Sequence, residues 1–384
     1  MQLKKLITLS KVTAIAILAS NALYAENYVA VEYLQYDEND NRVSVSAPSL
    51  TISHDIGTDY NVKIDVVHDA VSGASPVWQP DSGSGASSRD NSGDYVYDNE
   101  KFDEARTAGS IMLTTRLANR DELYTGIDYS RETDFDSKSV SVEYLHYTDD
   151  SHNRSINVGV SYAYNEILSY NEILSYDYDD TASGASQKET ATSINVQAGI
   201  SQILSKDSAM KAEFFTIIDD GYLSNPHTTV VRDYNIATRR LDGGDKRPDK
   251  RLAYGVNLKY NTLITDDLVY KANYRFYTDD WNIDSHTIDN DLYYEVNKDL
   301  IIGAGLRYYT QSEADFYNAS KDFFTTQTYA SSDERLSSFD AFTYKASVDY
   351  KITDALSYNL GAEFYTQSTG LDATFFTTGL KYRY

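Results

Sequence analysis

The chain has 384 residues, no cysteine and a formal net charge of −24 at pH 7. The lack of cysteine excludes a small disulfide-stapled scaffold. The acidity argues against nucleic acid as a partner, because phosphate binding requires a basic face. Tyrosine is unusually frequent, with 35 residues, and this residue favours strands and membrane–water boundaries.

The first 25 residues have the pattern of a secretory signal peptide. Three lysines flank a short apolar core, and small residues follow up to Ala25. This order is typical of an export signal, and we expect cleavage after Ala25, with Ala22 as the alternative. No later stretch has 18 apolar residues, which excludes a helical membrane protein. The sequence therefore predicts a signal peptide at 1–25 and one domain at 26–384.

The rest of the chain alternates apolar and polar residues with a period of two, which indicates β-strands. In LAYGVNLKY at 252–260, Leu252, Tyr254 and Val256 share one face, and Lys259 lies on the other. Sixteen such runs occur, at 28–37, 42–55, 60–70, 106–118, 122–132, 138–148, 153–166, 190–204, 208–218, 251–263, 267–278, 285–297, 300–311, 338–352, 355–367 and 372–384.

An even number of strands with one apolar face predicts a transmembrane antiparallel β-barrel of about 16 strands. Every second connection is a short polar turn, and four of the others are long, at 71–105, 167–189, 219–250 and 312–337. This alternation matches periplasmic turns and extracellular loops. Strand alternation alone also fits a soluble β-sandwich. The connections and the aromatic C-terminal strand, which resembles the strand recognised by the outer-membrane assembly machinery, favour the barrel.

The polar faces are expected to line the lumen, because a lipid-facing Lys or Arg near mid-bilayer costs roughly 2–4 kcal/mol. Two interpretations of these charges stay open. They can pair across strands and solvate the interior, or they can form a transverse field that selects a solute. The predicted pore-lining residues are Arg116, Lys259, Lys271, Arg275, Asp289, Asp291, Glu295, Arg307, Lys345, Asp349 and Glu363.

The long connection 71–105 is the candidate constriction of the lumen, because it carries Trp78, Tyr95, Tyr97 and Phe102. A sixteen-stranded barrel is wide, and its interior is commonly narrowed by a loop. The alternative is an outward cap exposed to the medium.

A basic cluster in TRRLDGGDKRPDKR at 238–251 includes Arg239, Arg240 and Arg247. Guanidinium groups match phosphate well, so contact with lipopolysaccharide phosphates is one interpretation. The other is a solvated loop whose aspartates balance the arginines.

His68, Asp69 and Ser72 resemble a catalytic constellation at first sight. Neighbours on a strand point to opposite faces, so His68 and Asp69 do not form the bonded pair of a catalytic triad. The six histidines are scattered without an HExxH motif, which argues against a zinc site. We expect no metal, no cofactor and no enzyme activity, and a membrane-embedded enzyme is the least favoured alternative.

Several segments resemble one family. They are DAVSGASP at 69–76, DGYLSNP at 220–226, RPDKR at 247–251, YRFYTDDWNIDSHT at 274–287, LRYYTQSEADFY at 306–317 and SSDERLSSFDAFTY at 331–344. Together they resemble the uncharacterised proteobacterial outer-membrane β-barrel proteins classed as a domain of unknown function. The resemblance implies barrel architecture and outer-membrane location, and it implies no activity.

These observations predict a porin-like or substrate-specific diffusion channel in the outer membrane of a Gram-negative bacterium. Acidic extracellular loops predict a weak preference for cations. The alternative is a non-conducting scaffold or partner-binding barrel that is plugged by its loops. Expected partners are outer-membrane lipid, lipopolysaccharide, the assembly machinery and a small solute, and a barrel of this size is compatible with a homo-oligomer.

Overall fold

The computed structural model describes residues 27–39, 42–77, 98–170, 186–226, 228, 230, 245–319 and 327–384. For residues 71–77, 98–103, 170 and 186 it describes the backbone only. The predicted signal peptide at 1–25 lies outside the described residues.

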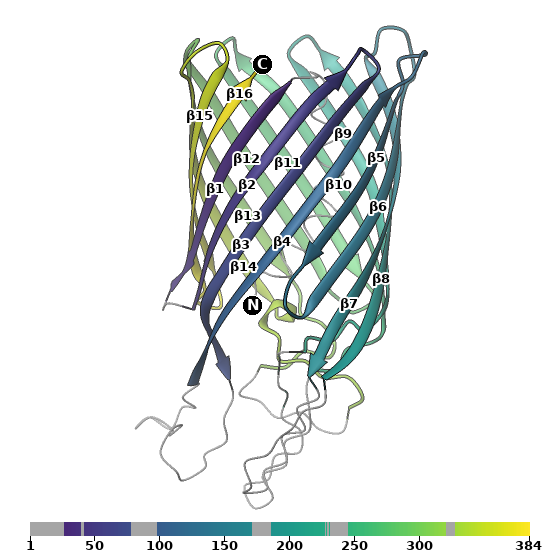
Figure 1. The fold of residues 1–384 in the computed structure, drawn as a ribbon, viewed down its shortest axis with the longest axis vertical. Coiled ribbons are helices and arrows are strands. Elements are labelled where there is room, and N and C mark those ends of the chain that lie inside the picture. Colours follow the sequence, from purple (N-terminus) through teal and green to yellow (C-terminus); the bar gives the residue numbers. More distant parts are fainter. Residues whose placement is uncertain are drawn as a thin grey trace, which may run out of the picture.

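Sixteen antiparallel strands form one closed barrel, in which each strand pairs with its sequence neighbours and β1 closes on β16 (Figure 1). The predicted fold is thus confirmed. The strands are β1 (Tyr28–Glu38), β2 (Val43–Ile56), β3 (Tyr60–Val77), β4 (Asp98–Arg116), β5 (Glu122–Arg131), β6 (Phe135–Tyr147), β7 (Arg154–Tyr170), β8 (Ser186–Ser205), β9 (Ser208–Gly221), β10 (Lys250–Thr265), β11 (Leu268–Asp279), β12 (Asp284–Asn297), β13 (Leu300–Gln311), β14 (Phe339–Lys351), β15 (Leu356–Gln367) and β16 (Asp372–Arg383).

The two ends of the barrel differ in their connections. Seven short turns and the C-terminus lie at one end, here called the turn end, which is uppermost in Figure 1. The long connections β3–β4, β7–β8, β9–β10 and β13–β14 lie at the other, here called the loop end. A short 3₁₀ helix, η3 (Glu334–Leu336), lies in the β13–β14 connection.

The outer wall of the barrel is apolar. Large apolar side chains that are more than a third exposed occur on nearly every strand, such as Val31, Ile127, Val158 and Phe376. A soluble monomer rarely exposes so large an apolar surface, whereas a lipid-facing barrel wall requires it. Within the described residues, no helix is long and apolar enough to cross a bilayer.

Two of the predicted long loops are shorter than expected. Strands β3 and β4 continue beyond the predicted ends, so that Val71 still pairs with Glu104 and Val77 with Asp98. Likewise β7 pairs with β8 as far as Tyr170 and Ser186. The parts of 71–105 and 167–189 described here are therefore paired strand. The strand ends were predicted from the alternation of apolar and polar residues. The extensions lack this alternation but remain paired through the backbone, so the prediction placed the strand ends too early.

Candidate functional site: the barrel interior

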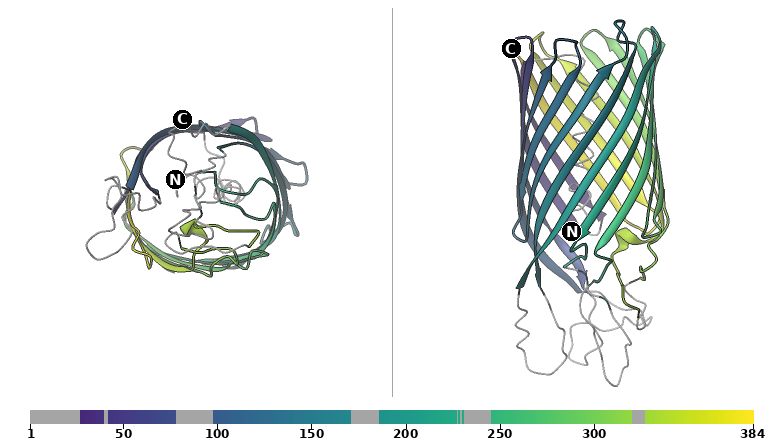
Figure 2. Two further views of the ribbon diagram at one scale, coloured as in Figure 1. Left: turned by 90° about the horizontal axis from the view of Figure 1, so that it is seen from below. Right: turned by 90° about the vertical axis from the view of Figure 1, so that its right-hand side faces the viewer.

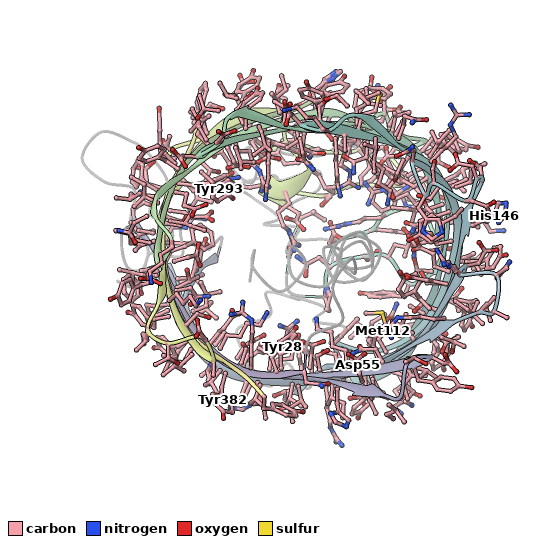
Figure 3. The ribbon with its side chains drawn as sticks, turned by 90° about the horizontal axis from the view of Figure 1, so that it is seen from above. Tyr28, Asp55, Met112, His146, Tyr293 and Tyr382 are labelled. Atoms are coloured by element: carbon pink, nitrogen blue, oxygen red, sulfur yellow. The ribbon has the colours of Figure 1, made fainter. Side chains whose placement is uncertain are left out.

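The register of the strands places all eleven predicted pore-lining residues on the interior face. Figure 3 shows Asp55, Met112 and Tyr293 pointing inward, whereas His146 and Tyr382 point outward. Residues that face each other across a strand pair share a face, and alternate residues along a strand do too. The predicted set follows this parity on every strand that contributes to it. Their role in a pore stays a prediction.

A network of ion pairs joins β12, β13 and β14 on the interior wall. Arg307 Nε donates to Asp289 Oδ1 over 2.6 Å, and Lys345 Nζ donates to the same oxygen over 2.9 Å. Lys345 also lies 3.3 Å from Asp291 Oδ1. The carboxylate of Asp291 passes over Gly305 to reach Lys345. A Cβ at position 305 would collide with this carboxylate, so the contact requires glycine there. One glycine thus allows a contact straight across the sheet between β12 and β14, which are not adjacent.

Three predicted cations have a different environment from these paired ones. Lys259, Lys271 and Arg275 lie on β10 and β11, and in the described part of the chain none has a carboxylate oxygen within 4 Å. Arg275 instead stacks over the Phe215 ring, with its guanidinium carbon 4.7 Å from the centroid. Lys271 Nζ lies 4.7 Å from the centroid of Tyr293.

The remaining predicted wall residues have separate positions. Arg116 lies near the turn end, where its guanidinium is 3.3 Å from Asp55 and donates to the Thr58 carbonyl. Glu363 lies directly opposite Lys345 in the register of β14 and β15. Glu295 and Asp349 lie on β12 and β14, closer to the turn end. The structure does not gather these four residues into one site.

The described parts of the β9–β10, β11–β12 and β13–β14 connections fold inward and form a plug. We use this name for residues 222–226, 245–249, 280–283, 312–319 and 327–338. Figure 2, left, shows η3 and neighbouring segments inside the ring of strands. Trp281, Phe316 and Leu336 of the plug pack against the interior residues Ile217 and Tyr277 in one buried apolar cluster. The cluster fixes the plug to the wall formed by β9, β10 and β11.

A buried arginine holds two plug segments together. Arg247 is 4% exposed, and its guanidinium donates to Asp245 and to Asp333, each over 2.6 Å. Burial alone would lower the pKa of Arg247, but the two carboxylates outweigh it and raise the pKa. Asn225 donates to both acids, through its backbone N–H to Asp245 and its side chain to Asp333. We call Arg247, Asp245 and Asp333 the latch.

The latch corrects one prediction. Arg247 was expected to contact lipopolysaccharide, but its side chain is buried between two acids and does not face lipid. Arg239 and Arg240, the other members of that prediction, lie outside the described residues, and so their contact with lipopolysaccharide stays a prediction.

The predicted constriction in 71–105 is not tested by the structure. Trp78, Tyr95 and Tyr97 lie outside the described residues, and only the backbone of Phe102 is described, in β4 opposite Gly73. The described interior loops come instead from the β9–β10, β11–β12 and β13–β14 connections, none of which had been predicted to enter the lumen. The signal that marks them is apolar side chains, such as Trp281 and Phe316, within otherwise polar connections.

His68 and Asp69 point to opposite faces of β3. His68 Nδ1 lies 3.0 Å from Thr107 Oγ1 on the outside, and the buried Asp69 pairs with Arg106 on the inside. They form no catalytic pair in this structure. Nearby, the carboxylates of Glu104, Glu132 and Asp134 approach one another closely enough to share a cation. Because Arg106 already pairs with Glu132 there, this acidic group does not by itself indicate a metal site.

A pocket of about 420 Å³ opens at the loop end beside the plug. Pro248, Trp281, Phe316 and Tyr329 supply its apolar walls, and Asp280 and Asp315 supply carboxylates. Trp281 and Phe316 are nearly buried, so they present little surface to a ligand. The pocket is a feature of the plug surface.

Several solved barrels resemble the fold. The ferric enterobactin receptor PfeA of Pseudomonas aeruginosa, as a mutant, aligns with a TM-score of 0.45 and 10% identity over 90% of this chain and 54% of the receptor. A bacterial polysaccharide outer membrane secretin gives 0.48 and 7%, over 94% and 99% of the two chains. The CymD monoaromatic hydrocarbon channel gives 0.43 and 8%, over 94% and 89%.

The chain thus spans about half the length of the enterobactin receptor. All three TM-scores are below 0.5, so no functional argument rests on them. No curated protein matches the sequence. Residues 6–377 match the model of the family described as protein of unknown function (DUF3570), and because this match spans nearly the whole chain, the protein belongs to that family.

Proposed function

We propose that this protein is a diffusion channel for small solutes in the outer membrane, narrowed at its loop end by the plug. One observation carries the proposal: charged side chains line the interior wall, whereas the outer wall is apolar. A charged wall requires water beside it, and a water-filled lumen is the usual reason for a polar interior in a membrane barrel.

The charge at the loop end supports a weak preference for cations. Asp280, Glu313 and Asp315 are exposed acids of the plug. Acids around an entrance concentrate cations there by electrostatic focusing. The outer-membrane location, the signal peptide and the recognition of the C-terminal strand by the assembly machinery are parts of the same proposal.

The plug favours a second candidate, a non-conducting barrel that presents its loop end to a partner. Its apolar cluster and its latch make the plug an ordered part of the fold. A plugged barrel would expose the same surface without passing solutes. The two candidates differ in whether the wild-type protein conducts.

Single-channel recording of the refolded protein in planar lipid bilayers separates them. The matched variant replaces residues 313–336 by a short Gly-Ser turn, because Gln311 and Phe339 are already paired in adjacent strands. Stable conductance steps with a weakly cation-selective reversal potential in the wild type support the channel. A silent wild type with a conducting variant supports the plugged barrel. Firm anion selectivity contradicts the role given to the acidic entrance.

A further inference from the structure

The outer wall changes character toward the loop end of β1 to β4, the strands at the front of Figure 1. On β9 and β10 this wall carries large apolar side chains, such as Phe214 at 50% and Tyr254 at 42% exposure. Beyond Tyr33 of β1 and Val66 of β3, the outward residues that the structure describes are small or polar. We call this surface the polar face, and its members are Gln35, Asp37, Ser44, Ser46, Pro48, His68, Ala70, Ala105 and Thr107.

Strand pairing places the small residues of the polar face side by side. Gln35 pairs with Ser46, and Ser46 pairs with Ala70. Ala70 in turn pairs with Ala105, so one straight row crosses four strands. Paired strands lie about 5 Å apart, which makes the row about 15 Å wide. Because three of its four side chains are Ser or Ala, this part of the outer wall is flat.

The polar side chains of the face are hydrogen-bonded to one another on the outside of the barrel. Gln35 Nε2 donates to Ser44 Oγ and to Asp37 Oδ1, each over 3.0 Å. Ser44 Oγ donates to the same Asp37 oxygen over 2.7 Å. Ser46 Oγ donates to the Tyr33 hydroxyl over 3.0 Å. These bonds fix the side chains and leave an amide and a carboxylate on the outer surface.

A surface of this kind matches lipid poorly. Phe376, the register partner of Gln35 on β16, is 46% exposed, so the face lies at a depth where the neighbouring wall is apolar. Hydrocarbon supplies no hydrogen bonds, and polar groups that face it lose those that water would offer. In membrane helices, small and polar residues gather where protein contacts protein, because they allow close approach and hydrogen bonds. The same reasons favour a protein cover over the polar face.

The charge of the polar face distinguishes between two covers, lipopolysaccharide and protein. None of its residues is a Lys or Arg, and Asp37 is an acid. Lipopolysaccharide phosphates are matched by cations, so this face does not suit them. Amides and hydroxyls both donate and accept hydrogen bonds, which makes the face complementary to itself. A twofold axis places such a surface against the same surface of a second copy.

We propose that the polar face is the contact between two copies of this chain, which pack wall to wall in the membrane about a twofold axis near Ser46. Gln35, Ser44 and Ser46 supply hydrogen bonds across the contact. Ala70 and Ala105 allow the two walls to approach closely. The contact lies on the outside of the barrel, so it does not depend on whether the lumen conducts.

Cross-linking in lipid vesicles tests this pairing, since the chain has no cysteine of its own. Ser46→Cys places a single thiol in the polar face, and the matched control Ala198→Cys places one on the exposed outer wall of β8. Both variants are reconstituted at high dilution in phosphatidylcholine vesicles and treated with a short bismaleimide. We expect a linked dimer from Ser46→Cys and little from Ala198→Cys, because only thiols held near each other react with both ends of the linker.

Sedimentation of the refolded protein in detergent measures the mass independently, and a dimer is expected for the wild type. Ser46→Trp should raise the dissociation constant of the dimer roughly tenfold or more, because a bulky ring separates the two walls. Ala198→Trp should leave this constant unchanged. Heat-modifiable electrophoretic mobility confirms that each variant is folded.

Equal linking of Ser46→Cys and Ala198→Cys refutes the pairing, and the vesicle result decides if detergent separates the copies. The pairing is also refuted if Ser46→Trp and Ala198→Trp shift the dissociation constant equally. Lipopolysaccharide is the other cover to be tested. If Ser46→Cys forms no linked dimer and added lipopolysaccharide protects its thiol from a soluble maleimide, lipid covers the face instead of a second copy.

Discussion

Strands β7 and β8 remain paired far toward the loop end, out to Tyr170 and Ser186, whereas the β9–β10 and β13–β14 connections leave their strands and pack inside the barrel. The interior faces beneath these two regions differ as well. The wall of β9 to β11 offers Ile217, Ala253 and Tyr277 to the plug. The interior positions of β6 to β8 are mainly polar, and include Ser139, Ser141, Asn157, Ser161, Asn195 and Gln197.

The apolar interior of β9 to β11 supplies the surface on which the plug packs. A long connection gains free energy by folding inward only where both partners bury apolar surface, at about 25 cal/mol per Å². Over the polar wall of β6 to β8, an inward loop would displace water without that gain.

The largest expected effect comes from removing the latch. Without it, the amides of the plug should exchange with solvent about as readily as those of an exposed loop. Arg247→Gln leaves Asp245 and Asp333 buried without their shared cation, and breaking a buried pair costs about 3–5 kcal/mol. We expect amide hydrogen exchange of Ala330 and Ser331 to accelerate by roughly a hundredfold or more. Both amides donate to carbonyls within the plug, those of Lys246 and Phe316.

Arg335→Gln is the control for the latch. Arg335 binds the same Asp333 but is less buried, and Arg247 remains to neutralise the acid. Its effect on exchange should be several times smaller. Unchanged exchange in Arg247→Gln would show that the apolar cluster alone holds the plug.

A smaller effect is expected from Gly255→Ala, which tests the wall under the plug. The added Cβ would collide with the Phe215 ring, and overpacking of this kind costs about 1–3 kcal/mol. Displacing Phe215 also removes the ring on which the Arg275 guanidinium stacks. Denaturant unfolding of the refolded barrel measures the loss of stability.

Gly109→Ala supplies the comparison on the other side of the barrel. A Cβ at Gly109 meets only the Asp65 carbonyl oxygen, at 3.5 Å, and one methyl of Val66. This contact is ordinary, so stability should stay close to the wild type. Equal losses in the two variants would mean that any strand glycine matters and that Phe215 has no special role.

The sequence predicts the strands well because lipid on one side and water on the other impose a period of two. It predicts the faces of Lys259 and Arg275 for the same reason. It does not predict the latch, since Arg247 and Asp333 are 86 residues apart and no local pattern joins them. Nor does it predict which wall cations are paired, because Asp291 reaches Lys345 only through the space left at Gly305.

The smallest effect concerns the turn end of the side without the plug. Asp121, in the β4–β5 turn, is 1% exposed and accepts hydrogen bonds from Asn119, His146 and the Tyr147 amide, at 2.6, 2.9 and 3.0 Å. Burial by itself would raise the pKa of Asp121, but these bonds and one from Tyr144 outweigh it and hold the pKa below the ordinary value of 3.8.

A carboxyl whose folded pKa is lowered stabilises the fold above its unfolded pKa and loses that contribution as pH falls. Above about pH 4, a change in pH should therefore not open the turn further. Below about pH 4 the turn should open increasingly, and exchange of the Tyr147 amide should reveal this opening. Asp121→Asn should open this turn at neutral pH and remove the pH dependence. Asp354→Asn, in the β14–β15 turn, should leave the Tyr147 profile unchanged, because Asp354 is fully exposed and pairs only with Lys351. A wild-type profile that stays flat down to pH 2 would mean that the bonds to Asp121 do not hold the turn closed.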